Sequence, residues 1–171
     1  SLEKKILLHL IKKFKNSVTH LEFGKNGDKI LVALDDGSIH YWEYRASLFL
    51  KKIKGHDGIV EALDFSLNGK SLISYASDKT VRIWDIDTAA QQKKFDMQSQ
   101  KIQDIRFVPK SKNFVTSGSD GLVKIWDSTN GNLIRKLEFH KNKINSLNFH
   151  PKDPVLLITG SDNYWVLWEI E

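Results

Sequence analysis

Hydrophobic and polar residues are grouped along this chain into short runs that turn-forming residues separate. The runs VEALDF, SLISYA and TVRIWD occupy residues 60–65, 71–76 and 80–85 and are rich in β-branched and aromatic side chains. Asn68-Gly69 and Ser77-Asp78 lie between them. Runs of this length and composition, separated by turn-forming residues, are typical of strands rather than helices. Together with a weaker fourth run, they predict a four-stranded antiparallel meander joined by tight turns.

The meander pattern repeats every 42 residues without a gap, most visibly at Trp42, Trp84, Trp126 and Trp168. One four-stranded sheet cannot bury both of its faces, so the copies are expected to stack on one another. An all-β chain with a period of about 40–45 residues indicates the blades of a β-propeller. Three apolar columns and one acidic column keep the same spacing: Val18, Val60, Ile102 and Ile144; Leu21, Leu63, Ile105 and Leu147; Phe23, Phe65, Phe107 and Phe149; Asp36, Asp78, Asp120 and Asp162.

With these residues the chain resembles the WD-repeat β-propeller family over essentially its whole length. The second copy carries the family pattern most fully, from Gly55-His56 to Trp84-Asp85. The resemblance implies a structural hydrogen-bond tetrad made of a loop His, a strand Ser or Thr, a turn Asp and a strand Trp. The complete tetrad is expected at His56, Ser74, Asp78 and Trp84. Reduced versions are expected at Thr116, Asp120 and Trp126 in the third copy, at His140, Asp162 and Trp168 in the fourth, and at Asp36 and Trp42 in the first.

A serine-hydrolase triad is the rival interpretation of His56, Asp78 and Ser74. The same spacing recurs around every tryptophan of the repeat, including copies that lack the His or the Ser. A triad is defined by the geometry of one site, and nothing in a catalytic role requires it to recur through a repeat. The sequence therefore favours a structural role, and we predict no catalytic residues and no enzymatic activity.

The repeat also predicts how the chain is divided into blades. Residues 1–13 align with the fourth strands of the later copies, and we expect an outer strand there, followed by complete blades at 14–55, 56–97 and 98–139 and by the first three strands of a fourth blade at 140–171. The resemblance implies that the N-terminal strand completes the last blade. WD propellers commonly have seven blades, so four repeats favour part of a larger propeller. A ring completed by another chain, with two copies giving eight blades, and a compact four-bladed ring are the alternatives.

Three sets of residues are candidate contact surfaces. Apolar residues near the two termini are expected to meet in a seam. The seam either closes the ring, where extra apolar burial is needed, or is a surface that contacts another protein. A basic rim on the outer strands is either a site for an acidic partner or a guard against edge-to-edge strand pairing, and the second interpretation is favoured. The resemblance also implies a partner-binding top face. The seam comprises Leu8, Leu10, Trp165 and Val166; the rim comprises Lys51, Lys52, Lys93, Lys94, Arg135 and Lys136; the top face comprises Asp35, Ser77, Ser119, Ser161, Ile59, Lys101 and Lys143.

Composition narrows the chemistry further. The formal net charge is +5, and most of the 26 basic residues are lysines. Lysine is poorly suited to the paired hydrogen bonds by which proteins recognise a nucleic-acid base. The absence of cysteine excludes disulfides and zinc–thiolate sites. The six histidines show no paired ligand spacing and no phosphate-binding glycine motif occurs, so no metal and no cofactor are predicted. No apolar run approaches the roughly 20 residues of a membrane span, and no secretory signal is recognisable. We therefore expect an intracellular protein, cytoplasmic or nuclear, with no membrane partner.

These observations favour a non-catalytic WD-repeat scaffold that mediates protein–protein interactions within a larger multi-subunit assembly. Its partners are expected to be other proteins, including a chain that completes the ring. The alternatives are a subunit of a ribonucleoprotein whose lysine-rich surface lies near RNA phosphates and an adaptor on an acidic cytoskeletal surface. RNA is the less favoured partner because a modest lysine excess does not by itself specify nucleic acid.

Overall fold

The computed structural model describes residues 14–24, 27–97, 101–150 and 153–170. Within these ranges the chain forms strands, turns and loops and no helix, which confirms the all-β prediction. The outer strand predicted at residues 1–13, with Leu8 and Leu10 of the seam, lies outside the described residues.

The strands form three four-stranded sheets and one three-stranded sheet, each an antiparallel meander whose neighbours in sequence are neighbours in the sheet. We call these sheets blades 1 to 4, and the first strand of each is its inner strand. Blade 1 comprises β1 (Val18–Phe23), β2 (Lys29–Leu34), β3 (Ile39–Glu43) and β4 (Leu48–Ile53); blade 2 comprises β5 (Val60–Phe65), β6 (Ser71–Ala76), β7 (Thr80–Asp85) and β8 (Gln91–Asp96); blade 3 comprises β9 (Ile102–Phe107), β10 (Asn113–Gly118), β11 (Leu122–Asp127) and β12 (Leu133–Glu138); blade 4 comprises β13 (Ile144–Phe149), β14 (Val155–Gly160) and β15 (Trp165–Glu169).

The turns between the second and third strands bring consecutive blades close together. Gly37 and Gly121 adopt φ values of 77° and 78°, a left-handed conformation that a side chain would strain. A Cβ at either position would also collide with the backbone carbonyl oxygen of His56 or His140 in the next blade. Glycine is therefore required there both for the turn and for the approach of the next blade.

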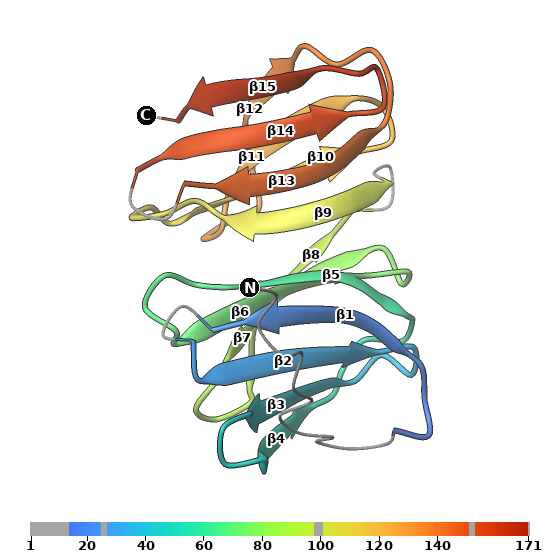
Figure 1. Cartoon of the computed structure of the whole chain (residues 1–171), viewed down its shortest axis with the longest axis vertical. Helices are drawn as coiled ribbons and strands as arrows, with labels where there is room; N and C mark the ends of the chain where they lie inside the picture. The colour runs from blue at the N-terminus through green and yellow to red at the C-terminus, as the bar shows by residue number, and fades with distance from the viewer. Residues whose placement is uncertain (1–13, 25–26, 98–100, 151–152, 171) are drawn as a thin grey trace, which may run out of the picture.

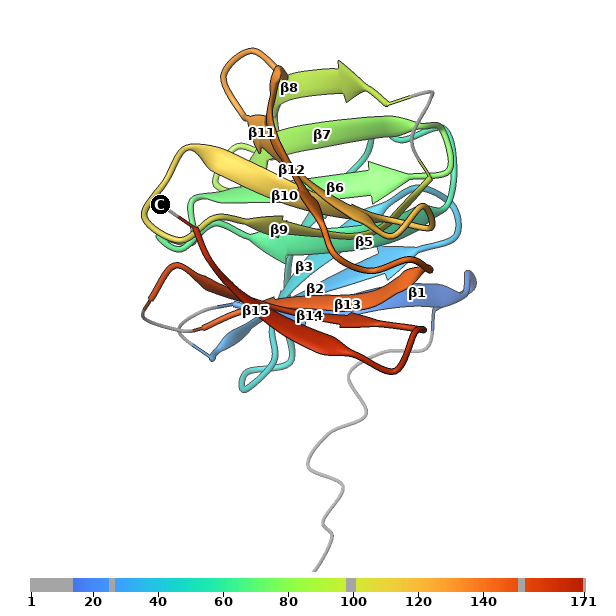
Figure 2. The same cartoon turned by 90° about the horizontal axis from the view of Figure 1, so that it is seen from above.

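The four blades form an arc. The inner strands β1, β5, β9 and β13 lie side by side in chain order, as Figure 1 shows. The other strands of blade 4 continue above β13 in that view, and those of blade 1 continue below β1. Seen from above, the outer strands of blades 2 and 3 extend away to one side (Figure 2). Blades 1 and 4 are thus the two ends of the arc.

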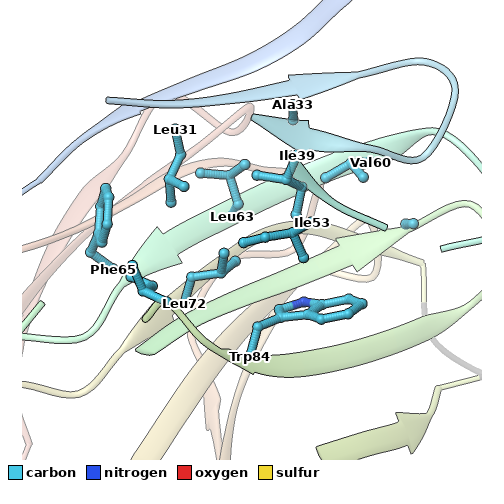
Figure 3. Close-up of a cluster of buried hydrophobic side chains, with 11 residues drawn as sticks. Leu31, Ala33, Ile39, Ile53, Val60, Leu63, Phe65, Leu72 and Trp84 are labelled. Atoms are coloured by element: carbon cyan, nitrogen blue, oxygen red, sulfur yellow. The ribbon is translucent and has the colours of Figure 1, made fainter. Parts of the chain in front are cut away.

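Three layers of the hydrophobic core lie between consecutive blades, and a smaller cluster of Val32, Leu34 and Trp42 lies on blade 1. Blades 2 and 3 use one face, the leading face, against the preceding blade and the opposite face, the trailing face, against the next. In these layers blade 1 uses its trailing face and blade 4 its leading face. Figure 3 shows the first layer, in which the trailing face of blade 1 meets the leading face of blade 2. The side chains labelled there are Leu31, Ala33, Ile39 and Ile53 from blade 1 and Val60, Leu63, Phe65, Leu72 and Trp84 from blade 2.

Candidate functional site

The four residues of the complete tetrad meet in blade 2. His56 precedes β5, Ser74 lies on β6, Asp78 lies in the β6–β7 turn and Trp84 lies on β7. The Nε2 atom of His56 lies 2.8 Å from the Ser74 hydroxyl, and its Nδ1 atom lies 3.0 Å from a carboxylate oxygen of Asp78. The indole nitrogen of Trp84 donates to the same hydroxyl at 2.9 Å. These contacts connect the loop before the inner strand with the second strand, the third strand and the turn between them.

The proton positions of this network follow from its donors. Trp84 can only donate, so the Ser74 oxygen accepts from the indole and its proton points to His56 Nε2. His56 then carries its proton on Nδ1 and donates it to Asp78. Burial lowers the pKa of His56, which favours this neutral form. Burial would raise the pKa of Asp78, but hydrogen bonds from His56 and from Thr80 outweigh it and hold the pKa well below its ordinary value.

Two further side chains that the tetrad prediction did not include complete the network. Arg82 of β7 donates to Asp78 at 3.1 Å and to the Thr80 hydroxyl at 3.0 Å, and its guanidinium lies 5.9 Å from the centre of the Trp84 ring. The Thr80 hydroxyl donates to Asp78 at 2.8 Å. Arg82 follows Asp78 by four residues, as Lys124 follows Asp120 at 2.9 Å in blade 3. This spacing was visible in the sequence and could have identified the partners.

The same positions in the other blades form only parts of the network. In blade 3 the Trp126 indole donates to the Thr116 hydroxyl at 2.8 Å. In blade 1 Asp36 accepts from the backbone of Ser38 at 3.0 Å and lies 3.5 Å from Lys52. In blade 4 the Nδ1 atom of His140 lies 2.8 Å from Asp162. The Nε2 atom of His140 and the Nε1 atom of Trp168 are buried, and neither has a hydrogen-bond partner among the described residues.

A hydroxyl at the position of Ile158 in blade 4 should give the buried nitrogen atoms of His140 and Trp168 a partner. Ile158 occupies the position of Ser74 and is 1% exposed. In Ile158→Thr the new hydroxyl would pair with both orphaned nitrogen atoms of His140 and Trp168. In Ile158→Val the same volume is lost without a hydroxyl, which makes it the matched control. We expect the Thr variant to be more stable than the Val variant by about 1–3 kcal/mol in urea unfolding. Equal stability of the two variants would show that the orphaned groups cost nothing.

The burial of the network bears on the hydrolase interpretation. Ser74 has no exposed surface, and its oxygen already accepts a hydrogen bond from Trp84. A nucleophile must be within reach of its substrate, and this hydroxyl is enclosed between two blades. The arrangement is therefore suited to fixing the loop and the turn of the blade.

A second polar group lies among the inner strands. The Arg106 guanidinium on β9 lies 3.2 Å from Glu22 on β1 and donates to the backbone carbonyl oxygens of Leu63 on β5, at 3.0 Å, and Leu147 on β13, at 3.3 Å. One side chain thus contacts the inner strands of all three other blades. These contacts satisfy the guanidinium within the protein, so Arg106 holds the arc together.

The predicted top-face residues are paired within each blade. The backbone N–H of Ser77 donates to the carbonyl oxygen of Ile59 at 2.8 Å. Equivalent bonds join Ser119 to Lys101, Ser161 to Lys143 and Asp35 to Ser17. The structure thereby gathers the predicted set at the end of each sheet where the inner strand begins.

The basic rim follows the outer strands β4, β8 and β12, and Lys93 of this rim borders a groove of about 510 Å³ between blades 2 and 3. Lys110 and Lys112 of the β9–β10 turn lie on the groove as well. In the sequence these two lysines fall at repeat positions other than those of the predicted rim. The remaining groove lining is Ser66, Leu67, Asn68, Ser71, Ile83, Gln92, Phe107, Val108, Ser111, Ser128 and Thr129.

Of the predicted seam, Trp165 is 68% exposed and Val166 is half-buried.

The described residues contain no cluster of three or more histidine, aspartate or glutamate side chains suited to a metal ion. Within the described ranges no helix is long and apolar enough to span a membrane.

Comparisons with known proteins agree with this geometry. The profile of the WD domain, G-beta repeat, matches residues 7–43 and 47–85, and that of the anaphase-promoting complex subunit 4 WD40 domain matches residues 91–151. No curated protein matches the sequence. Solved structures of U3-55K and of the RRP9 WD40 repeats each superpose with a TM-score of 0.81 over 94% of this chain, at 21% sequence identity. This chain covers 51% and 50% of them, so it spans about half of their length, and the likeness shows the fold.

Proposed function

Because this chain belongs to the WD-repeat β-propeller family, we propose that it is a non-catalytic, intracellular scaffold that binds other proteins within a multi-subunit assembly. The observation that carries the proposal is the groove between blades 2 and 3. The polar networks of the blades are engaged within the fold, whereas the groove presents its charges at the surface.

The groove combines positive charge with an apolar floor. Lys93, Lys110 and Lys112 are exposed on its walls, and Ile83 and Val108 are buried at its base. Ser66, Ser111 and Thr129 add hydroxyl groups to the lining. Lysine side chains attract carboxylates, and an apolar floor accepts an aliphatic side chain. The arrangement therefore fits an extended acidic protein segment with an apolar residue at its centre.

An RNA strand fits the groove less well. Proteins that bind single-stranded nucleic acid without sequence preference combine positive charge with exposed aromatic rings on which bases stack. Phe107 is the only aromatic residue among those that line the groove, and it is half-buried. The lysines alone would give salt-sensitive contacts to phosphates, which is the ribonucleoprotein alternative.

A binding measurement with defined probes tests the proposal. A fluorescent glutamate-rich peptide with a central leucine is titrated with the whole chain, alongside a uridine oligonucleotide of similar length. We expect the peptide to bind at low salt, to weaken at about 0.5 M salt and to lose about tenfold or more in affinity in Lys93→Glu/Lys110→Glu.

Two outcomes would contradict the proposal. Tighter binding of the oligonucleotide than of the peptide at the same salt concentration would favour the ribonucleoprotein alternative. Unchanged peptide affinity in the double variant, with an unchanged unfolding transition, would remove the groove as the binding site.

A further inference from the structure

A second hollow adjoins the groove between blades 2 and 3. It has a volume of about 420 Å³ and lies among the inner strands. Leu67 of the β5–β6 turn and Phe107, the last residue of β9, line both the groove and this hollow. A segment that lies in the groove can therefore continue into the hollow. We call it the inner hollow and define it by Phe65, Leu67, Arg106, Phe107, Pro109 and Phe149.

The chemistry of the inner hollow differs from that of the groove. None of the described residues that line it is a lysine. Its charged side chains are engaged within the fold, because Arg106 lies 3.2 Å from Glu22 and the Asp64 carboxylate accepts from the backbone N–H of Phe107 at 2.8 Å. An acidic side chain would meet the carboxylates of Glu22 and Asp64 there. The inner hollow therefore favours an uncharged apolar side chain.

Leu67 is an exposed leucine in a turn that does not require one. The other repeats have Lys25, Pro109 and Pro151 at this position, and turns favour polar residues, glycine and proline. Leu67 is nonetheless 45% exposed at the border of the groove and the inner hollow. Leu67 and Phe107 belong to blades 2 and 3, which have a neighbouring blade on each side. This apolar surface is therefore open although the blades that carry it are packed on both faces.

Leu67 also borders a smaller hollow between blades 1 and 2, which has a volume of about 150 Å³. That hollow has less than half the volume of the inner hollow, and the acidic residue Asp28 lies on its wall. A bulky side chain next to an acidic stretch therefore has more room in the inner hollow than between blades 1 and 2.

We propose that the acidic partner segment in the groove continues past Leu67 and places a second apolar side chain, an aromatic ring, in the inner hollow. The inference rests on the proposed function, because the lysines of the groove supply the charge that holds the segment. Aromatic rings pack against one another in offset or edge-to-face arrangements, and Phe65, Phe107 and Phe149 line the inner hollow. The partner is then recognised by acidic residues around one apolar side chain and by an aromatic residue a few positions away.

Fluorescent peptides that differ at one position test the inference with the whole chain. The glutamate-rich peptide with a central leucine is extended at one end, and then at the other, by a short tail that carries either phenylalanine or serine. We expect the phenylalanine peptide to bind about tenfold more tightly than the serine peptide at one of the two ends. In Leu67→Gln this affinity ratio should fall close to one. Leu133→Gln is the matched control, because Leu133 is 41% exposed on the outer strand β12, and it should keep the ratio.

A second variant and the possible outcomes separate this inference from the proposed function. Asn148 lines the inner hollow, so Asn148→Glu places a carboxylate there and should also lower the ratio. Urea unfolding checks that each variant is folded. Equal affinities of the phenylalanine and serine peptides at both ends, with binding that still depends on Lys93 and Lys110, would overturn this inference alone. A ratio that survives both Leu67→Gln and Asn148→Glu would overturn the inner hollow as the site, and failure of every peptide to bind would overturn the proposed function as well.

Discussion

Replacing Asp78 with asparagine is expected to lower the free energy of unfolding by about 3–5 kcal/mol, because it leaves a buried charge without its partner. The Arg82 side chain is 6% exposed and lies 3.1 Å from Asp78. Its other acidic neighbour, Asp57, is 4.0 Å away and almost fully exposed. The amide of asparagine would also direct N–H donors toward a site that already contains the donors of Thr80 and Arg82.

A double-mutant cycle with Arg82→Met measures this effect in urea unfolding. Asp78→Asn/Arg82→Met removes both charges and should recover a large part of the loss, since no charge is then left unpaired. Asp36→Asn in blade 1 is the matched control, because Asp36 and its partner Lys52 are both about one-third exposed. Equal losses in Asp78→Asn and Asp36→Asn would show that burial of the pair is not the cause.

The pH dependence of this difference has a definite sign. The pKa of Asp78 is held below its ordinary value of 3.8 in the folded state, where burial alone would raise it but its hydrogen bonds prevail. Its contribution is therefore complete above the unfolded pKa, begins to decrease there, and is lost as the pH falls on through the lower folded pKa. The stability gap between the parent and Asp78→Asn should narrow below about pH 4. Burial lowers the pKa of His56, so the parent should also lose stability as the pH falls below about 6.5.

Replacing Ser74 with alanine is expected to cost about 2–5 kcal/mol, the second largest effect we predict. The change leaves two buried groups without a partner, His56 Nε2 and the Trp84 indole N–H, and each such group costs about 1–3 kcal/mol. Thr116→Val in blade 3 removes a hydroxyl whose side-chain partner among the described residues is the Trp126 indole, and it should cost about half as much.

Ser74→Thr is the conservative control for this prediction. It keeps the hydroxyl, and blade 3 already has threonine at the equivalent position. It should retain most of the parent stability in the same urea titration. A Ser74→Ala loss no larger than that of Thr116→Val would contradict the role of Ser74 as a bridge between His56 and Trp84.

Much of the fold could be predicted because it depends on local and repeated signals. The 42-residue spacing of Trp42, Trp84, Trp126 and Trp168 predicted the stacking of four meanders, and the apolar columns predicted the layers between them. The irregular pairing near the start of each inner strand, as between Val60 and Ala62, could not be predicted. The extra residue shifts the alternation of side chains by one, so that Val60 and Leu63 face the same side three residues apart, but one such spacing in a sequence does not by itself distinguish a bulge from a turn.

The surface was harder to predict for a physical reason. The groove joins Lys93 of one blade to Lys110 and Lys112 of the next, and its shape depends on how two sheets pack. Aligning the four repeats compares equivalent positions of the blades, whereas this groove is built from positions that are not equivalent. Arg106 shows the same limit, because its carbonyl partners on β5 and β13 leave no trace in the identity of Leu63 or Leu147.

The most direct test of the scaffold role compares two charge-reversal variants that are matched in net charge. Lys93→Glu/Lys110→Glu alters the groove between blades 2 and 3, and Lys101→Glu/Lys143→Glu alters the top face. The dissociation constant of the glutamate-rich peptide is measured for both at low salt. We expect the groove variant to lose about tenfold or more in affinity and the top-face variant to stay close to the parent. The opposite ranking would contradict the assignment of the groove as the surface that binds partners.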